Sequence, residues 1–145
     1  MSIKKTVNMR PTDKRLDYLW RTACAARDGY VCVYSKEIHH KIVERDLQVH
    51  HIYKKATHRM RWDMDNGITL TKGVHFYVAH GPGIRPDQFK QWAIQRLPKK
   101  AQDRIEMYKN AVGGVDRFAL ELYLLNQCRK YKANLLTGSN YVLGE

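Results

Sequence analysis

Five of the seven histidines in this chain lie close together in the sequence, in an order that suggests a metal site. They are His50, His51, His58, His75 and His80. Imidazole nitrogens are common metal ligands, and a histidine can also act as a general base because its ordinary pKa is about 6.5. A His-His pair, a basic loop, an Asn-Gly and a later histidine follow one another in this stretch. We therefore predict a small metal site built on a hairpin and a helix.

Two apolar segments around these histidines are predicted to be strands, and a helix is predicted after the second. Leu47–Tyr53 and Ile68–Leu70 have the composition of strands, and the helix is expected from about Val74 onward. Neighbouring residues on a strand point to opposite faces. His50 and His51 can therefore serve one site only where a bulge or twist turns both toward it, and we expect such a distortion.

Further elements are predicted on both sides of this stretch. Apolar residues recur at helical spacing from Lys14 to Arg27, and Asp28-Gly29 ends that helix. Tyr30–Tyr34 is predicted to be a short strand, and helices are expected at Asp87–Arg96 and after Pro98. The chain is thus expected to be a single α+β domain over residues 1–145, with a basic arm and first helix (1–29), a core (30–97) and a C-terminal helical extension (98–145).

The composition is that of a folded, strongly basic protein. Among 145 residues there are 26 Lys and Arg against 14 Asp and Glu, which gives a net charge of +12 and a pI of about 9.8. Such a protein most often meets a polyanion, so nucleic acid is the first expected partner, and a basic protein without one is the alternative. Cys24, Cys32 and Cys128 form no close pair, and no apolar stretch has the length of a signal peptide or a membrane span. We expect a reducing intracellular compartment and no membrane partner.

The basic loop between the predicted strands is a candidate DNA-binding segment. Its candidate contacts are Lys54, Lys55, His58, Arg59 and Arg61. Arg61 could instead pair with Asp63 or Asp65, and the sequence leaves both roles open. Beside an Asn-Gly, these two aspartates more often cap a turn than bind a metal ion. The other pair, His39-His40, has no Asn-Gly after it and is expected to be part of a solvated loop.

The segments VHHI and RWDMDNGITL, with the histidine after Thr-Lys-Gly-Val, resemble the HNH endonucleases and in particular their small phage-type members. This family is also called ββα-metal or His-Me finger. The resemblance implies an α+β fold in which a ββα-metal core is flanked by N- and C-terminal helices. It also implies that His50 and His75 bind a divalent metal ion, that His51 is the general base and that Asn66 fixes the loop.

The sequence departs from the family pattern where relatives often hold a structural zinc ion. Two C-x-x-C pairs bind that zinc, whereas this chain has Cys32-x-x-Ser35 and Thr71-x-x-Val74 at the corresponding positions. No structural zinc is expected, since three of the four ligands are missing. Apolar packing is expected to replace it, around Tyr30, Val33, Trp62 and Val74.

A second departure concerns His80. Relatives commonly have a histidine four residues after the first helix ligand, but here Ala79 stands at that place and His80 follows it. On an ideal α-helix His80 is turned by about 140° from His75. His80 is therefore expected to reach the metal only if the helix ends in a wide turn near Gly81, and otherwise to be a helix C-terminal residue.

The function implied by the resemblance is metal-dependent DNA cleavage, by nicking or by cutting both strands. The expected cofactor is one divalent ion, Mg²⁺ or Mn²⁺, although two imidazoles also suit Zn²⁺ or Ni²⁺. A catalytically inactive, DNA-binding phage accessory protein is the alternative, and an RNA-binding protein is a weaker one because no RNP-type aromatic motif is present. A C₂ homodimer would suit double-strand cutting. If the protein is phage-encoded, the expected location is the cytoplasm of the bacterial host.

Overall fold

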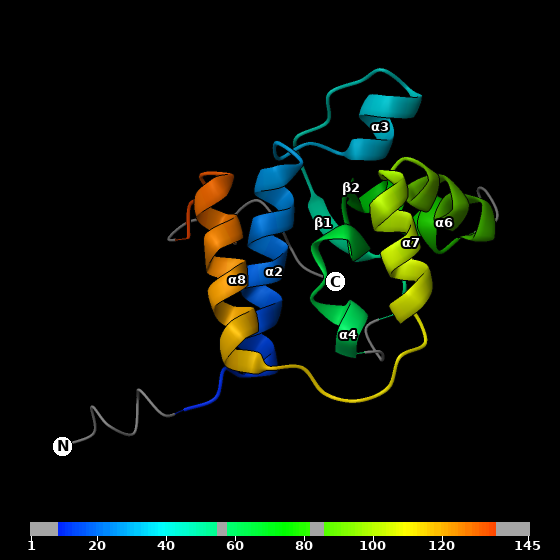
Figure 1. The fold of residues 1–145 in the computed structure, drawn as a ribbon. Helices are drawn as coiled ribbons and strands as arrows, with labels where there is room; N and C mark the ends of the chain where they lie inside the picture. Colours follow the sequence, from blue (N-terminus) through cyan, green and yellow to red (C-terminus); the bar gives the residue numbers. More distant parts are fainter. Residues whose placement is uncertain (1–8, 55–57, 82–85, 136–145) are drawn as a thin grey trace.

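The computed structural model describes residues 9–54, 58–81 and 86–135, which form an α+β fold around one antiparallel hairpin. The hairpin consists of β1 (Leu47–His51) and β2 (Gly67–Thr71), and it lies between two groups of helices (Figure 1). None of the described helices has both the length and the apolar character needed to cross a bilayer. The predicted α+β class is confirmed at this level.

The first described helix, α2 (Asp13–Arg27), forms for the reasons that its sequence predicts. The Thr12 hydroxyl caps it by accepting from the backbone N–H of Arg15 at 3.1 Å. Its predicted apolar face is fully buried, at Leu16, Leu19, Trp20, Ala23 and Cys24. This face packs between the hairpin and α8 (Arg117–Lys130), which lies beside α2 in Figure 1.

The hairpin presents a different set of side chains to each side. Its register pairs His50 with Ile68 and His51 with Gly67, and all five pairs of β1 follow the same alternation. Val49 belongs to the apolar cluster of α2 and α8, whereas Ile68 belongs to a second cluster on the other side. The expected distortion at the His-His pair is therefore wrong, because both histidines keep regular strand partners and point to opposite faces.

The prediction of a strand at Tyr30–Tyr34 is also wrong. Gly29 and Tyr30 both adopt left-handed backbone conformations, with φ of 72° and 55°, so the chain turns sharply after α2. The helix α3 (Val33–Ile38) then begins within the segment predicted to be extended. Short apolar segments are ambiguous because a strand and one buried face of a short helix share the same composition.

Apolar packing occupies the region around Cys32 and Ser35, where packing in place of a structural zinc ion was expected. Cys32 is fully buried, and the Ser35 hydroxyl donates to its Sγ at 3.2 Å. Val33 is buried in the same cluster, and Tyr30 and Val74 pack against it. Trp62, which was expected here, lies instead in the cluster formed with α2 and α8.

The remaining elements surround the hairpin. Between the strands are α4 (His58–Arg61) and the 3₁₀ turn η1 (Met64–Asn66), and after β2 come α5 (Lys72–Val74) and the π-helical turn η2 (His75–Ala79). The helices α6 (Pro86–Gln95) and α7 (Lys99–Tyr108) follow, on the side of the hairpin opposite to α2 and α8 (Figure 1).

Candidate metal centre

Three of the predicted metal ligands come together in space. One nitrogen each from His50, His75 and His80 lies within 4.8 Å of the other two. The ring centroids of the three imidazoles form a nearly equal triangle with sides of 4.9, 4.8 and 4.8 Å. His50 comes from β1, His75 begins η2 and His80 follows η2 directly. These three histidines lie close enough to bind a metal ion.

The spacing between His75 and His80 suits two ligands of one ion. Their Nε2 atoms lie 3.0 Å apart. Two nitrogens bound at about 2.1 Å to one tetrahedral ion would be separated by about 3.4 Å, so a movement of about 0.4 Å would turn this pair into two ligands. The third imidazole, that of His50, is packed edge-on by Phe89 of α6, with 5.6 Å between ring centroids. This contact restricts the orientation of the His50 ring.

Gln48 orients His75, and sequence reasoning missed this residue. Nδ1–H of His75 donates to Oε1 of Gln48 at 2.6 Å, which leaves Nε2 of His75 as the nitrogen that can bind a metal. The signal was available in the sequence, because Gln48 precedes His50 by two residues and therefore lies on the same face of β1.

The position of His80 depends on the wide turn that the spacing requires. η2 is a π-helical turn, in which backbone hydrogen bonds join residues five apart rather than four. This turn brings His80 next to His75 although the two residues are five positions apart in the sequence. Gly81 packs directly against the backbone of this turn. A methyl group at this residue would overlap the carbonyl oxygen of Phe76.

His51, the expected general base, lies on the other face of the hairpin. Its ring stacks on Trp20 at 4.0 Å between centroids, and its Nε2–H donates to the carbonyl oxygen of Arg61 at 2.9 Å. The side chain is only 7% exposed. His51 therefore packs on α2 and is not part of the triangle formed by His50, His75 and His80.

Asn66 makes the contacts that a loop-fixing residue needs. It is fully buried, and its Nδ2 donates to the carbonyl oxygens of Tyr53 and Met60, each at 2.9 Å. Its Oδ1 accepts from the backbone N–H of Tyr53 at 2.7 Å. One side chain thus holds both ends of the basic loop. The following Gly67 starts β2 with a φ of −112°, so the Asn-Gly is not a two-residue hairpin turn here.

Arg61 pairs with aspartates of α2 in this fold, rather than with Asp63 or Asp65, the partners considered from the sequence. Its Nε and Nη2 donate to the two carboxylate oxygens of Asp17 at 3.1 and 2.8 Å, and its Nη1 reaches Asp13 at 3.4 Å. The hydrogen bond to Asp17 raises the pKa of Arg61. The guanidinium also lies 5.0 Å from the ring centre of Trp62. Its donors are therefore directed to α2 rather than to the solvent.

Of the other predicted DNA contacts, the side chains of Lys54 and Arg59 lie in the described part of the chain. Lys54 and Arg59 are exposed, and the guanidinium of Arg59 lies 5.3 Å above the ring of Tyr108. Lys55 and the side chain of His58 lie outside the described part of the chain. Lys54 and Arg59 are therefore accessible at the surface.

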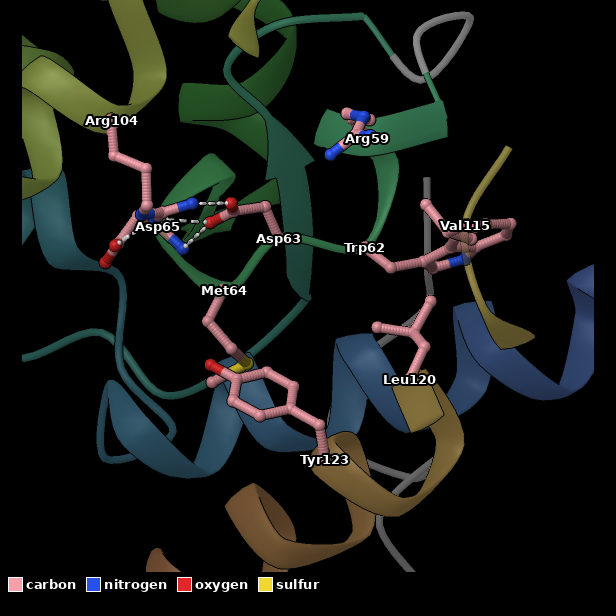
Figure 2. A pocket seen from close by; sticks show the side chains of 9 residues that line it. All are labelled: Arg59, Trp62, Asp63, Met64, Asp65, Arg104, Val115, Leu120 and Tyr123. Atoms are coloured by element: carbon pink, nitrogen blue, oxygen red, sulfur yellow. Dashed lines mark hydrogen bonds and ion pairs between the residues drawn. The ribbon is translucent and has the colours of Figure 1, made fainter. Parts of the chain in front are cut away.

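Asp63 and Asp65 bind an arginine rather than a partner in the basic loop. Figure 2 shows Arg104 of α7 reaching into a pocket and contacting both carboxylates, with Tyr123 of α8 on the opposite wall. The hydrogen bond to Asp63 is the largest cause of the raised pKa of Arg104. Asp63 also accepts from the backbone N–H of Asp65 at 2.9 Å, which confirms the predicted turn-capping role.

The triangle of histidines is open on one side. His50 and His75 are 5% and 7% exposed, whereas His80 is exposed. A groove of about 710 Å³ is lined by His75, His80 and Gln48. A metal ion at this centre would therefore keep a side that faces solvent, as a catalytic centre requires and a closed structural site does not.

We expect the hydrogen bond from His75 to Gln48 to control metal affinity. Replacing Gln48 by Leu keeps the size of the side chain but removes the acceptor, and loss of such a partner typically weakens metal binding by about 10- to 100-fold. Gln48→Glu, which keeps an acceptor at the same place, should retain the affinity. Competition with a chromophoric chelator measures both variants. Equal affinity of Gln48→Leu and wild type would show that His75 needs no such partner.

Comparisons with known proteins assign no family to this chain. No protein-family model matches it, and no match was found among curated proteins or solved structures.

Proposed function

We propose that this protein is a metal-dependent endonuclease that hydrolyses phosphodiester bonds in DNA. The single observation that carries the proposal is the triangle formed by His50, His75 and His80, which opens onto a groove. Its ligands come from a hairpin and from the helical segment that directly follows it. This order is the one that a ββα-metal core has, and the net charge of +12 suits a polyanionic substrate.

In this proposal, the chain's own residues hold the metal ion and the loop beside it. A bound divalent ion would neutralise developing charge on the phosphate and stabilise the leaving oxygen. His50, His75 and His80 would bind the ion through nitrogen, with Gln48 holding the ring of His75. Asn66 would keep the basic loop in place, so that Lys54 and Arg59 can contact the DNA backbone.

His51 remains the proposed general base. Because its Nε2–H is directed to the carbonyl oxygen of Arg61, Nδ1 is the nitrogen that would accept a proton from water. The stacking on Trp20 would hold the ring in this orientation. His51 is the last residue of β1, so the water would have to approach at the end of the strand.

The proposed ion is Zn²⁺ or Ni²⁺ in preference to Mg²⁺ or Mn²⁺. The three ligands are all imidazoles, and imidazole suits Zn²⁺ and Ni²⁺, whereas Mg²⁺ and Mn²⁺ prefer oxygen ligands. This ordering moves away from the Mg²⁺ or Mn²⁺ expected from the sequence, because His80 adds a third nitrogen to the two that were expected.

The test is cleavage of supercoiled plasmid by the metal-free protein after addition of Mg²⁺, Mn²⁺, Zn²⁺ or Ni²⁺, with EDTA as the blank. Conversion to open-circle or linear DNA with metal only, and its loss in His51→Ala and His51→Phe, is the expected result. His51→Phe keeps an aromatic ring against Trp20 but cannot accept a proton, so it separates catalysis from packing. Cleavage by His51→Phe at the wild-type rate would remove His51 from the mechanism.

A non-catalytic DNA-binding protein is the second candidate, and the burial of His51 favours it. A side chain that is 7% exposed and stacked on Trp20 has a structural role whether or not it takes part in chemistry. For such a protein no metal would support cleavage of plasmid or branched DNA. Binding would still depend steeply on salt, because it would come from contacts between basic residues and phosphates.

A further inference from the structure

Two exposed aromatic side chains lie in contact with each other beside the metal centre. Phe76 and Tyr77 of η2 are 63% and 57% exposed, and their rings meet edge to face at 4.9 Å between centroids. Trp20, Trp62 and Phe89 are, by contrast, at most 1% exposed. The apolar core therefore forms without Phe76 and Tyr77, and their rings are accessible to a ligand.

Both rings line the same groove as the metal centre. Phe76 and Tyr77 stand on the wall of this groove together with His75 and His80, and they directly follow His75 in the chain. Their distance from the metal centre is therefore set by the same π-helical turn that positions the ligands. If the reacting group of a bound molecule lay at the three histidines, the adjacent part of that molecule would contact the rings of Phe76 and Tyr77.

The charge of the chain, more than that of the groove, bears on what kind of molecule this is. The groove is lined by exposed Lys72 and exposed Asp46, whose charges balance. The chain as a whole has a net charge of +12. A ligand that combines flat aromatic groups with negative charges matches exposed aromatic rings, a lysine and a metal centre together. Nucleotides have this combination, because each base offers a π face and each phosphate a negative charge.

We propose that Phe76 and Tyr77 form a stacking subsite for unpaired bases, so that the preferred ligand is single-stranded nucleic acid. This inference deepens the proposed function and rests on it for the position of the scissile phosphate. In a duplex both faces of each internal base are covered by neighbouring bases, and a protein ring can stack only on a base that is unpaired, terminal or turned out. The subsite therefore selects single-stranded segments, including those at flaps, gaps and branches.

Binding measurements in EDTA test the subsite without any cleavage. A fluorescein-labelled single-stranded oligonucleotide of about 12 nucleotides and the duplex of the same sequence are titrated with protein, and anisotropy is recorded. The double variant Phe76→Ala/Tyr77→Ala should bind the single strand about 10- to 100-fold more weakly than wild type, since stacking on each base contributes about fivefold or more. Its affinity for the duplex should stay within about twofold, because phosphate contacts are unchanged.

Matched variants separate stacking from general effects. Phe118→Ala removes another exposed aromatic ring, 48% exposed on α8 and away from the groove, and should leave both affinities unchanged. Phe76→Trp should retain or strengthen single-strand binding. Circular dichroism and thermal melting check that the exposed substitutions leave the fold intact. An equal loss for single strand and duplex, or no loss for either, would overturn the subsite and leave the rings as a surface for a protein partner.

Failure of the stacking subsite and failure of the proposed function can be told apart by experiment. Ring-dependent single-strand binding by a protein that cuts no DNA with any metal would uphold the subsite and reject the nuclease. Metal-dependent cleavage with binding that ignores Phe76 and Tyr77 would uphold the nuclease and reject the subsite.

Discussion

Replacing His80 by Ala is expected to lower the affinity for Zn²⁺ or Ni²⁺ by at least about 100-fold and to abolish metal-dependent cleavage. His80 supplies one corner of the triangle, and its Nε2 lies 3.0 Å from that of His75. Its side chain is exposed, so its loss leaves no cavity in the core. Isothermal titration with metal and plasmid cleavage at saturating metal measure the two effects.

His39→Ala is the matched control for this variant. His39 is also exposed and follows directly after a helix, but it lies on α3's side of the fold and its ring contacts Tyr34. Metal affinity and cleavage should both stay at the wild-type level in His39→Ala. If His80→Ala bound metal as tightly as His39→Ala, the triangle would not be the metal centre, and the proposed function would lose its main support.

Gly67→Ala is expected to lower the free energy of unfolding by about 2–3 kcal/mol. A Cβ at this position would stand 2.6 Å from Sγ of Cys24 and 2.7 Å from Cζ2 of Trp20. Both neighbours are fully buried on α2 and cannot move aside without disturbing the apolar core. Thermal melting should show a decrease in Tm of roughly 6–12 °C for a chain of this size.

Gly73→Ala provides the comparison for Gly67→Ala. An added Cβ at Gly73 has nothing within 4 Å, and the residue lies in α5, where Ala is the better helix former. We expect its stability to equal or slightly exceed that of wild type. A Gly67→Ala protein that melted like Gly73→Ala would mean that α2 and β2 do not pack as closely as described.

The parts of the fold that follow local patterns were predictable from the sequence. The helix α2 has a capping Thr12 and a periodic apolar face. β1 lies within the segment Leu47–Tyr53 that was predicted to be a strand, and β2 contains the predicted strand Ile68–Leu70. The segment at Tyr30–Tyr34 was wrong because its composition fits both a strand and a short buried helix. The left-handed turn at Gly29 and Tyr30 decides between them, and that turn depends on how α2 packs.

In the candidate site, too, features that depend on nearby residues were predictable, whereas contacts between residues far apart in the sequence were not. The resemblance to the HNH endonucleases implied His50 and His75 as two ligands, and the condition stated for His80, a wide turn, is met by η2. The partner of Arg61 could not be predicted. Asp17 lies 44 positions away in the sequence, and only the packing of α2 on the loop brings the two together.

The pairing of α2 with α8 also has a consequence for how the chain folds. Arg117 of α8 donates to Asp13 of α2 at 2.5 Å across 104 positions of sequence, and the apolar faces of the two helices cover each other. During synthesis at about 5–20 residues per second, α2 would wait roughly 5–20 s for this partner. Contacts of such long range slow folding, because the chain must close a large loop before it gains their energy. The packing of α2 against α8 would thus be completed late, after the last helix described here has been made.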